Sequence, residues 1–182
     1  DRQDLIDHLG TIAKSGTSAI MEELSKAKEK DKDALNLIGQ FGVGFYASFM
    51  VANKVDVISR KIGTKDFNVW SSDGKTGFTL DEATTEQQAL IDQSGTVIIL
   101  HIKDDASEYL VEPKLQAIIE TWADHVDVPV YLGRIDEDSD EEETPVNAAS
   151  ALWSRPKSEI SQEDYTSFFH HLSMGFKMDE PL

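Results

Sequence analysis

A glycine-rich turn, an apolar run and an alternating segment follow one another in Gly39-Gln-Phe-Gly-Val-Gly-Phe-Tyr-Ala-Ser-Phe-Met-Val-Ala-Asn-Lys-Val-Asp-Val-Ile-Ser-Arg60. The continuous apolar residues at 45–53 predict a buried helix. From Val55 onward the pattern changes to an alternation rich in β-branched residues, which predicts a strand over 55–60. This stretch therefore predicts a turn, a helix and a strand in immediate succession.

The turn carries glycines at positions 39, 42 and 44, in a G-x-x-G-x-G pattern. Glycine accepts positive φ and lets a backbone approach a ligand closely. Successive N–H groups in such a loop can surround an anion, and the following helix would add its positive N-terminal end. The spacing differs from the dinucleotide-binding G-x-G-x-x-G, and no Walker A Gly-Lys-Ser/Thr follows. Two interpretations stay open from the pattern alone, a phosphate cradle and a tight turn.

Outward from this stretch, strands and helices alternate without a repeat. Strands are predicted at 67–70, 77–80, 96–102 and 128–132, and helices at 2–9, 17–28 and 112–125. Ser161-Gln-Glu-Asp164 predicts the capped start of one more helix, whose aromatic stripe we expect in a core. This mixed order indicates the α+β class for residues 1–134.

The charge of the chain is concentrated near one end. The 182 residues include 34 acidic and 17 basic side chains, for a net charge of −17, and residues 135–182 carry nine of these negative units. The acidic run at 135–144 repels itself and lacks the spacing of an EF-hand, so it predicts a solvated linker rather than a calcium site. We therefore expect domains at 1–134 and 150–182, joined by a linker at 135–149.

Composition also limits the kinds of partner molecule and the cellular compartment that we expect for this protein. An excess of acids argues against binding to nucleic acid or to an anionic membrane, because both need a basic surface. No apolar run approaches the ~20 residues that span a bilayer. The chain has no cysteine, which fits a reducing, cytoplasmic setting. No histidine or carboxylate spacing predicts a metal site, since His170 and His171 are adjacent and no H-E-x-x-H occurs.

A second glycine-containing segment lies before the glycine-rich turn at 39–44. Leu9-Gly-Thr-Ile-Ala-Lys-Ser-Gly-Thr17 places Gly10 and Gly16 on either side of Lys14. The glycines could act as hinges, and the lysine could offer its ammonium group to a phosphate. The alternative interpretation is a turn that ends a helix and carries a surface lysine.

Four segments follow in chain order: Leu9–Thr17, Ile38–Tyr46, Ser94-Gly-Thr96 with the following Val-Ile-Ile-Leu-His, and Ala151–Ile160 with the aromatic helix after it. Together they resemble the bacterial form of the 90-kDa heat-shock protein chaperones. The first three resemble the ATP-binding domain of that family, and the last resembles the opening of its middle domain. The resemblance is collinear over essentially the whole chain.

The resemblance implies a fold and a set of nucleotide contacts. The fold would be part of the two-layer sandwich shared by gyrases, histidine kinases and mismatch-repair ATPases, followed by the beginning of a second α/β domain. A lid at about 10–40, hinged at Gly10 and Gly16, would close over ATP, with Lys14 at its phosphates. Thr96 would lie at the floor of the adenine pocket. The phosphate loop would comprise Gly39, Gln40, Phe41, Gly42, Val43, Gly44 and Phe45.

The resemblance also implies functional residues beyond the two ends of this chain. The catalytic glutamate, the magnesium-binding asparagine and the adenine-reading aspartate of the family would precede Asp1, and a γ-phosphate arginine would follow Leu182. The expected parent is a cytoplasmic, homodimeric, stress-related ATPase that uses ATP and Mg²⁺ to act on unfolded client proteins. The chain alone is expected to be catalytically inactive. The alternative is a non-enzymatic acidic module that binds partner proteins without a nucleotide.

Overall fold

The computed structural model describes residues 1–10, 42–126, 128–134, 144–149, 152 and 156–172. The chain divides into two compact units, Asp1–Glu108 and Tyr109–Leu182. The predicted domain boundary at residue 135 stays a prediction. The predicted α+β class is confirmed by the helices and the antiparallel sheet of the first unit.

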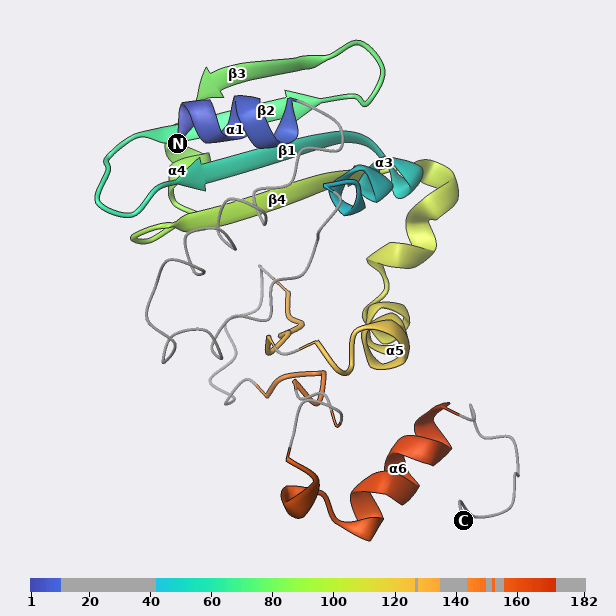
Figure 1. The fold of residues 1–182 in the computed structure, drawn as a ribbon. Helices are drawn as coiled ribbons and strands as arrows, with labels where there is room; N and C mark the ends of the chain where they lie inside the picture. The colour runs from blue at the N-terminus through green and yellow to red at the C-terminus, as the bar shows by residue number, and fades with distance from the viewer. Residues whose placement is uncertain (11–41, 127, 135–143, 150–151, 153–155, 173–182) are drawn as a thin grey trace. The chain divides into compact units, whose positions relative to one another are not determined.

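The first unit is built on a four-stranded antiparallel sheet of order β3-β2-β1-β4 (Figure 1). All four strands predicted within residues 55–102 are present, each extended or shifted by one to three residues. Short turns join β1 to β2 and β2 to β3, as the glycine, aspartate and lysine residues between them predict. The strands are β1 (Ala52–Arg60), β2 (Phe67–Ser72), β3 (Phe78–Glu82) and β4 (Gly95–Ile102).

Helix α1 (Arg2–Leu9) confirms the helix predicted at the start of the chain. Its N-terminus is closed by a capping box, because the Asp1 carboxylate accepts from the N–H of Gln3 at 2.9 Å and of Asp4 at 3.1 Å. Figure 1 shows α1 lying across one face of the sheet. The helix predicted at 17–28 lies outside the described residues.

The apolar run after the glycine turn forms two short helical turns, η2 (Gly44–Ala47) and α3 (Ser48–Val51). The prediction of a buried helix over 45–53 is therefore wrong in two respects. The helix ends at Val51, because Ala52 is extended, 2 % exposed and paired with Ile102 as the first residue of β1. In addition, no residue of η2 or α3 is fully buried, because only one side of these turns packs against the sheet.

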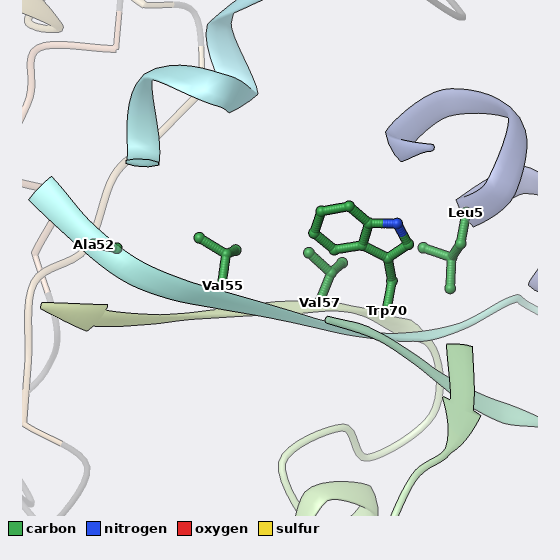
Figure 2. Close-up of a cluster of buried hydrophobic side chains, with 5 residues drawn as sticks. All are labelled: Leu5, Ala52, Val55, Val57 and Trp70. Carbon is green, nitrogen blue, oxygen red and sulfur yellow. The ribbon is translucent and has the colours of Figure 1, made fainter. Parts of the chain in front are cut away.

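The core beneath α1 is formed by every second residue of the central strands. Val55 and Val57 of β1 and Trp70 of β2 share one face, since Val57 pairs with Trp70 and Val55 is two residues away. Leu5 of α1 packs into the same cluster, and Figure 2 shows these side chains on one side of the strands. We call this surface the helix face. Leu9, Phe45, Phe49 and Leu80 complete it as partly buried neighbours.

The opposite face of the sheet contains a second apolar cluster and one buried acid. Ile58 and Val69 pack there with residues of the segment between β3 and β4, where α4 (Thr85–Gln88) is capped by Thr84. Asp56 lies on this face with its side chain 7 % exposed. Its carboxylate accepts from the Ser71 hydroxyl, interacts with His101 Nε2 at 2.7 Å and forms an ion pair with Lys54 at 2.9 Å.

Burial by itself would raise the pKa of Asp56, but the hydrogen bonds from Ser71, His101 and Lys54 outweigh it and hold the pKa below its ordinary value. Asp56→Asn is expected to lower the free energy of unfolding at neutral pH by roughly 1–3 kcal/mol, because it removes a charged acceptor from three donors. The stabilisation from the carboxylate is fully present above the unfolded pKa, near 3.8. It is lost as the pH falls through the lower folded pKa.

Urea unfolding of the unmodified protein and the Asp56→Asn variant at a series of pH values tests this linkage. The difference in unfolding free energy between the two proteins should be largest above about pH 5 and should shrink toward about pH 2. A difference that stays constant over this range would contradict the assignment of a stabilising charge to Asp56.

The second unit contains helices α5 (Glu112–Trp122) and α6 (Gln162–Leu172). Both were predicted, α5 with a proline in its first turn and α6 with a cap in which Asp164 N–H donates to Ser161 Oγ at 3.1 Å. A 3₁₀ turn, η3 (Asp104–Leu110), precedes α5, and another, η5 (Lys157–Glu159), precedes α6. The aromatic stripe of α6 is less buried than predicted, since Tyr165 is 40 % exposed.

The strand predicted at 128–132 is not formed. Instead, this segment is held by the buried amide of Asn147, whose Nδ2 donates to the carbonyls of Ala123, Val126 and Val128 at 3.0–3.3 Å. Its Oδ1 accepts from Val130 N–H at 2.8 Å. A side chain thus satisfies backbone groups that a neighbouring strand would otherwise satisfy. The Asn147 side chain thereby links residues 123–130, which precede the acidic run, to a residue that follows it.

Candidate functional site

The described part of the glycine-rich turn begins at Gly42, whose φ is +64°. A residue with a side chain is strained in this left-handed conformation, so glycine is required here by the backbone itself. Val43 follows with φ −110° and precedes the first residue of η2. At Gly44 an added Cβ would meet nothing within 4 Å, so this position leaves open space beside the turn.

The turn leads directly into the helical residues 44–51. The first N–H groups of a helix have no carbonyl partner within the helix, and the helix dipole places a partial positive charge at the same end. In this segment Tyr46 N–H donates to Val43 O at 3.1 Å, which closes the first turn. The N–H groups before it can therefore serve an anion that approaches the open side of Gly44.

The two flanks of residues 11–41 lie together. The Tyr46 hydroxyl donates to Leu9 O at 2.8 Å, which links the end of α1 to η2 across 37 residues of sequence. Gly10 closes α1, because its N–H donates to Ile6 O at 3.0 Å and to Leu5 O at 3.2 Å. A Cβ at Gly10 would lie 2.5 Å from Ile6 O and 2.8 Å from the ring of Phe78, so a larger residue would disturb the end of α1.

Aromatic side chains fix the glycine turn to the helix face. The ring of Phe45 meets Trp70 edge-on at 5.6 Å and Phe49 edge-on at 6.3 Å. Phe78 of β3 also stacks on Trp70, with ring centroids 5.9 Å apart. Because Trp70 is 2 % exposed and sits on a central strand, it gives the turn a rigid base.

Thr96 lies at the beginning of β4 and pairs with Ser59 of β1. Since Ser59 is two residues from Val57, Thr96 is on the helix face, and its hydroxyl lies 3.0 Å from that of Ser59. The α3 segment joins β1 at Ala52, at the other end of the strand. The structure therefore places Thr96 and the glycine turn on one face, toward opposite ends of β1.

The predicted site residues fall into two groups. Gly10, Gly42, Val43, Gly44, Phe45 and Thr96 are described. Phe45 and Thr96 lie on the helix face, Gly10 ends α1 beside Phe78, and residues 42–44 lead into η2. Tyr46 and Trp70 also belong to this site but are not predictable from the sequence, because nothing in the local pattern shows that a hydroxyl or a ring contacts residues far along the chain. Lys14, Gly16, Gly39, Gln40 and Phe41 lie outside the described residues.

Among the described residues of the first unit, two hollows of the surface lie away from the glycine turn. One, of about 670 Å³, lies between the start of α1 and the β1–β2 turn, and the other, of about 320 Å³, lies beside Lys54 and Ser71. Neither is lined by a predicted site residue, so volume alone does not mark the site. Over the described ranges, no group of three or more histidine, aspartate or glutamate side chains could hold a metal ion. Within those ranges, too, no helix is long and apolar enough to cross a membrane.

Three curated relatives of this chain are all chaperone proteins named HtpG. The chain is 50 % identical over 178 residues to the chaperone protein HtpG of Gluconobacter oxydans. It is 45 % identical over 175 residues to that of Methylobacterium nodulans and 45 % identical over 181 residues to that of Rhodopseudomonas palustris. These matches cover 96–100 % of the chain and 26–27 % of the relatives, so the chain spans about a quarter of their length. No family model matches the chain.

Proposed function

Because this chain belongs to the HtpG family of bacterial chaperone proteins, we propose that it carries the phosphate-binding segment of an ATP-dependent chaperone. One observation supports this function most strongly. The positive-φ glycine turn starts a helix at the place where the two flanks of residues 11–41 are joined by the Tyr46–Leu9 hydrogen bond. A segment that leaves and returns at one point beside an anion-binding turn suits a lid over a nucleotide.

In this proposal each predicted residue has a separate task. Backbone N–H groups of the loop at 39–45 donate to the phosphate oxygens of ATP, and the ammonium group of Lys14 neutralises their charge. Gly10 and Gly16 provide the backbone freedom for residues 10–40 to close. The Thr96 hydroxyl contributes to the adenine end of the site, directly or through water.

ATP reactions of this kind use Mg²⁺ on the phosphates. The described residues offer no convergent set of carboxylate or imidazole ligands, so we assign no step to the metal. The function of the chain in this proposal is to bind and orient the triphosphate and to exclude water from it when residues 10–40 close.

The wider proposal concerns the full-length protein. We place the ATP-binding domain at 1–134, the acidic linker at 135–149 and the start of a middle domain at 150–182. The protein would be a cytoplasmic homodimer that uses ATP binding and hydrolysis to change its conformation on unfolded client proteins, without binding nucleic acid or membranes. The acidic character of the chain, with a net charge of −17, supports the exclusion of nucleic acid.

Lys14→Met in the full-length protein tests the phosphate role. Loss of one charge-assisted contact to a phosphate should weaken ATP binding by about tenfold to a hundredfold, because such contacts contribute roughly 1.5–3 kcal/mol. Binding of adenosine, which has no phosphate, should change by less than about twofold. Calorimetric titration of both ligands measures the difference.

Lys65→Met is the matched control, since Lys65 is an exposed lysine in the loop between β1 and β2 and its removal changes the net charge equally. Unchanged ATP affinity in the Lys14 variant would refute the role of Lys14. Absence of ATP binding by the unmodified protein would refute the nucleotide function and favour the acidic interaction module.

A further inference from the structure

Lys103 connects the end of β4 to the carbonyl end of α3. Its Nζ donates to Phe49 O at 2.9 Å and to Met50 O at 3.0 Å. Its backbone N–H donates to Val51 O at 2.9 Å. Three successive carbonyls at the end of the helical segment therefore accept hydrogen bonds from a single residue.

These hydrogen bonds give the last carbonyls of the short helix the donors that they lack within the helix. The last carbonyls of a helix have no partner within the helix, and a cation near them interacts favourably with the negative end of the dipole. Segments as short as η2 (Gly44–Ala47) and α3 (Ser48–Val51) are not stable by themselves in water. Their position must therefore be set by contacts from outside the segment.

The contacts that residues 44–51 make with the rest of the protein differ in how strongly they determine the position of this segment. Phe45 and Phe49 hold one side of the segment against the apolar cluster of the helix face. Apolar contacts have little directional preference, so they determine which side of the segment faces the sheet more firmly than its position along its axis. The Tyr46 hydroxyl, which donates to Leu9 O at 2.8 Å, holds the start of the segment but not its end. The hydrogen bonds from Lys103 are directional and fix the segment along its axis.

We propose that Lys103 is a positioning residue for the phosphate-binding turn. By fixing the end of residues 44–51, it holds the N–H groups at the start of the same segment in the orientation that meets the phosphates of ATP. This inference rests on the proposed nucleotide function. It also gives β4 two tasks in the site, since the strand carries Thr96 at its beginning and leads into Lys103 at its end.

The test compares ATP with adenosine in the full-length protein by calorimetric titration. Lys103→Met keeps the apolar stem but removes the ammonium group, and we expect ATP affinity to fall about tenfold. Adenosine affinity should change by less than about twofold, because only the phosphate-binding end is displaced. Lys103→Arg retains donors for the carbonyls and should keep ATP affinity within about threefold. Lys75→Met, in the exposed β2–β3 turn, is the matched control and should bind both ligands like the unmodified protein.

The outcomes separate this inference from the function on which it rests. If Lys103→Met binds ATP as the unmodified protein does, or loses ATP and adenosine affinity equally, the positioning role is wrong and the nucleotide function stands. If the unmodified protein binds no ATP, both are wrong. Should Lys103→Met fail to fold, Lys103→Gln can be tested instead, because it keeps a hydrogen-bond donor on a shorter side chain. This variant is expected to lose less ATP affinity and to bind adenosine like the unmodified protein.

Discussion

Trp70→Ala is expected to lower the free energy of unfolding by about 3–5 kcal/mol, a large part of the total for most domains. Trp70 is 2 % exposed and contacts the rings of Phe45 and Phe78, with ring centroids at 5.6 and 5.9 Å. Its Nε1 has no hydrogen-bond partner among the described residues, so the loss comes from packing and from the cavity left behind. Because α1 and the glycine turn rest on this ring, local order on the helix face should fall with stability.

Urea unfolding followed by circular dichroism measures this effect. Trp122→Ala is the matched control, because Trp122 is 78 % exposed and its removal should change the unfolding free energy by no more than about 0.5 kcal/mol. Equal effects of the two substitutions would show that Trp70 is not the centre of the core.

Gly42→Ala is expected to have the second large effect, on ATP binding. At φ +64° the alanine side chain is strained by about 1–3 kcal/mol, and the turn must distort to relieve the strain. Distortion would turn the N–H groups of Val43 and Gly44 away from a phosphate. We expect ATP affinity to fall at least about tenfold in the full-length protein, with a smaller effect on adenosine.

Gly63→Ala provides a control with the same backbone cost. Gly63 has φ +77° in the β1–β2 turn, and an added Cβ there meets nothing within 4 Å. Both variants should therefore lose similar stability, and only Gly42→Ala should lose ATP affinity. If both variants bind ATP equally well, the loop containing Gly42 is not the phosphate site.

The local patterns of the sequence predicted the four strands within 52–102 well, because these segments are rich in β-branched and aromatic residues and are ended by turn residues. The prediction of one buried helix over residues 45–53 was wrong for a physical reason. Their apolar run continues from a helix into β1, and only the pairing of Ala52 with Ile102 determines where the helix ends. Likewise, residues 128–132 resemble a strand in composition, but the Asn147 side chain takes up their backbone groups from 17–19 residues further along the chain.

The parts of the candidate site that depend on glycine could be predicted from the sequence. The parts that depend on contacts between residues far apart in the chain could not. Gly42 needs its positive φ, and the spacing of the glycines pointed to it. Tyr46 and Lys103 contribute through carbonyls 37 and 53–54 residues away, and no periodicity encodes such a contact. Thr96 was named from a resemblance, and strand register then placed it on the helix face.

Hydrogen–deuterium exchange of the full-length protein, with and without nucleotide, tests the central claim most directly. If the glycine turn binds phosphates, ATP should slow exchange of the amides at 42–45, and adenosine should leave them nearly unchanged. Equal exchange of these amides in the presence of ATP and adenosine, while ATP is bound, would contradict the phosphate-binding role of this turn.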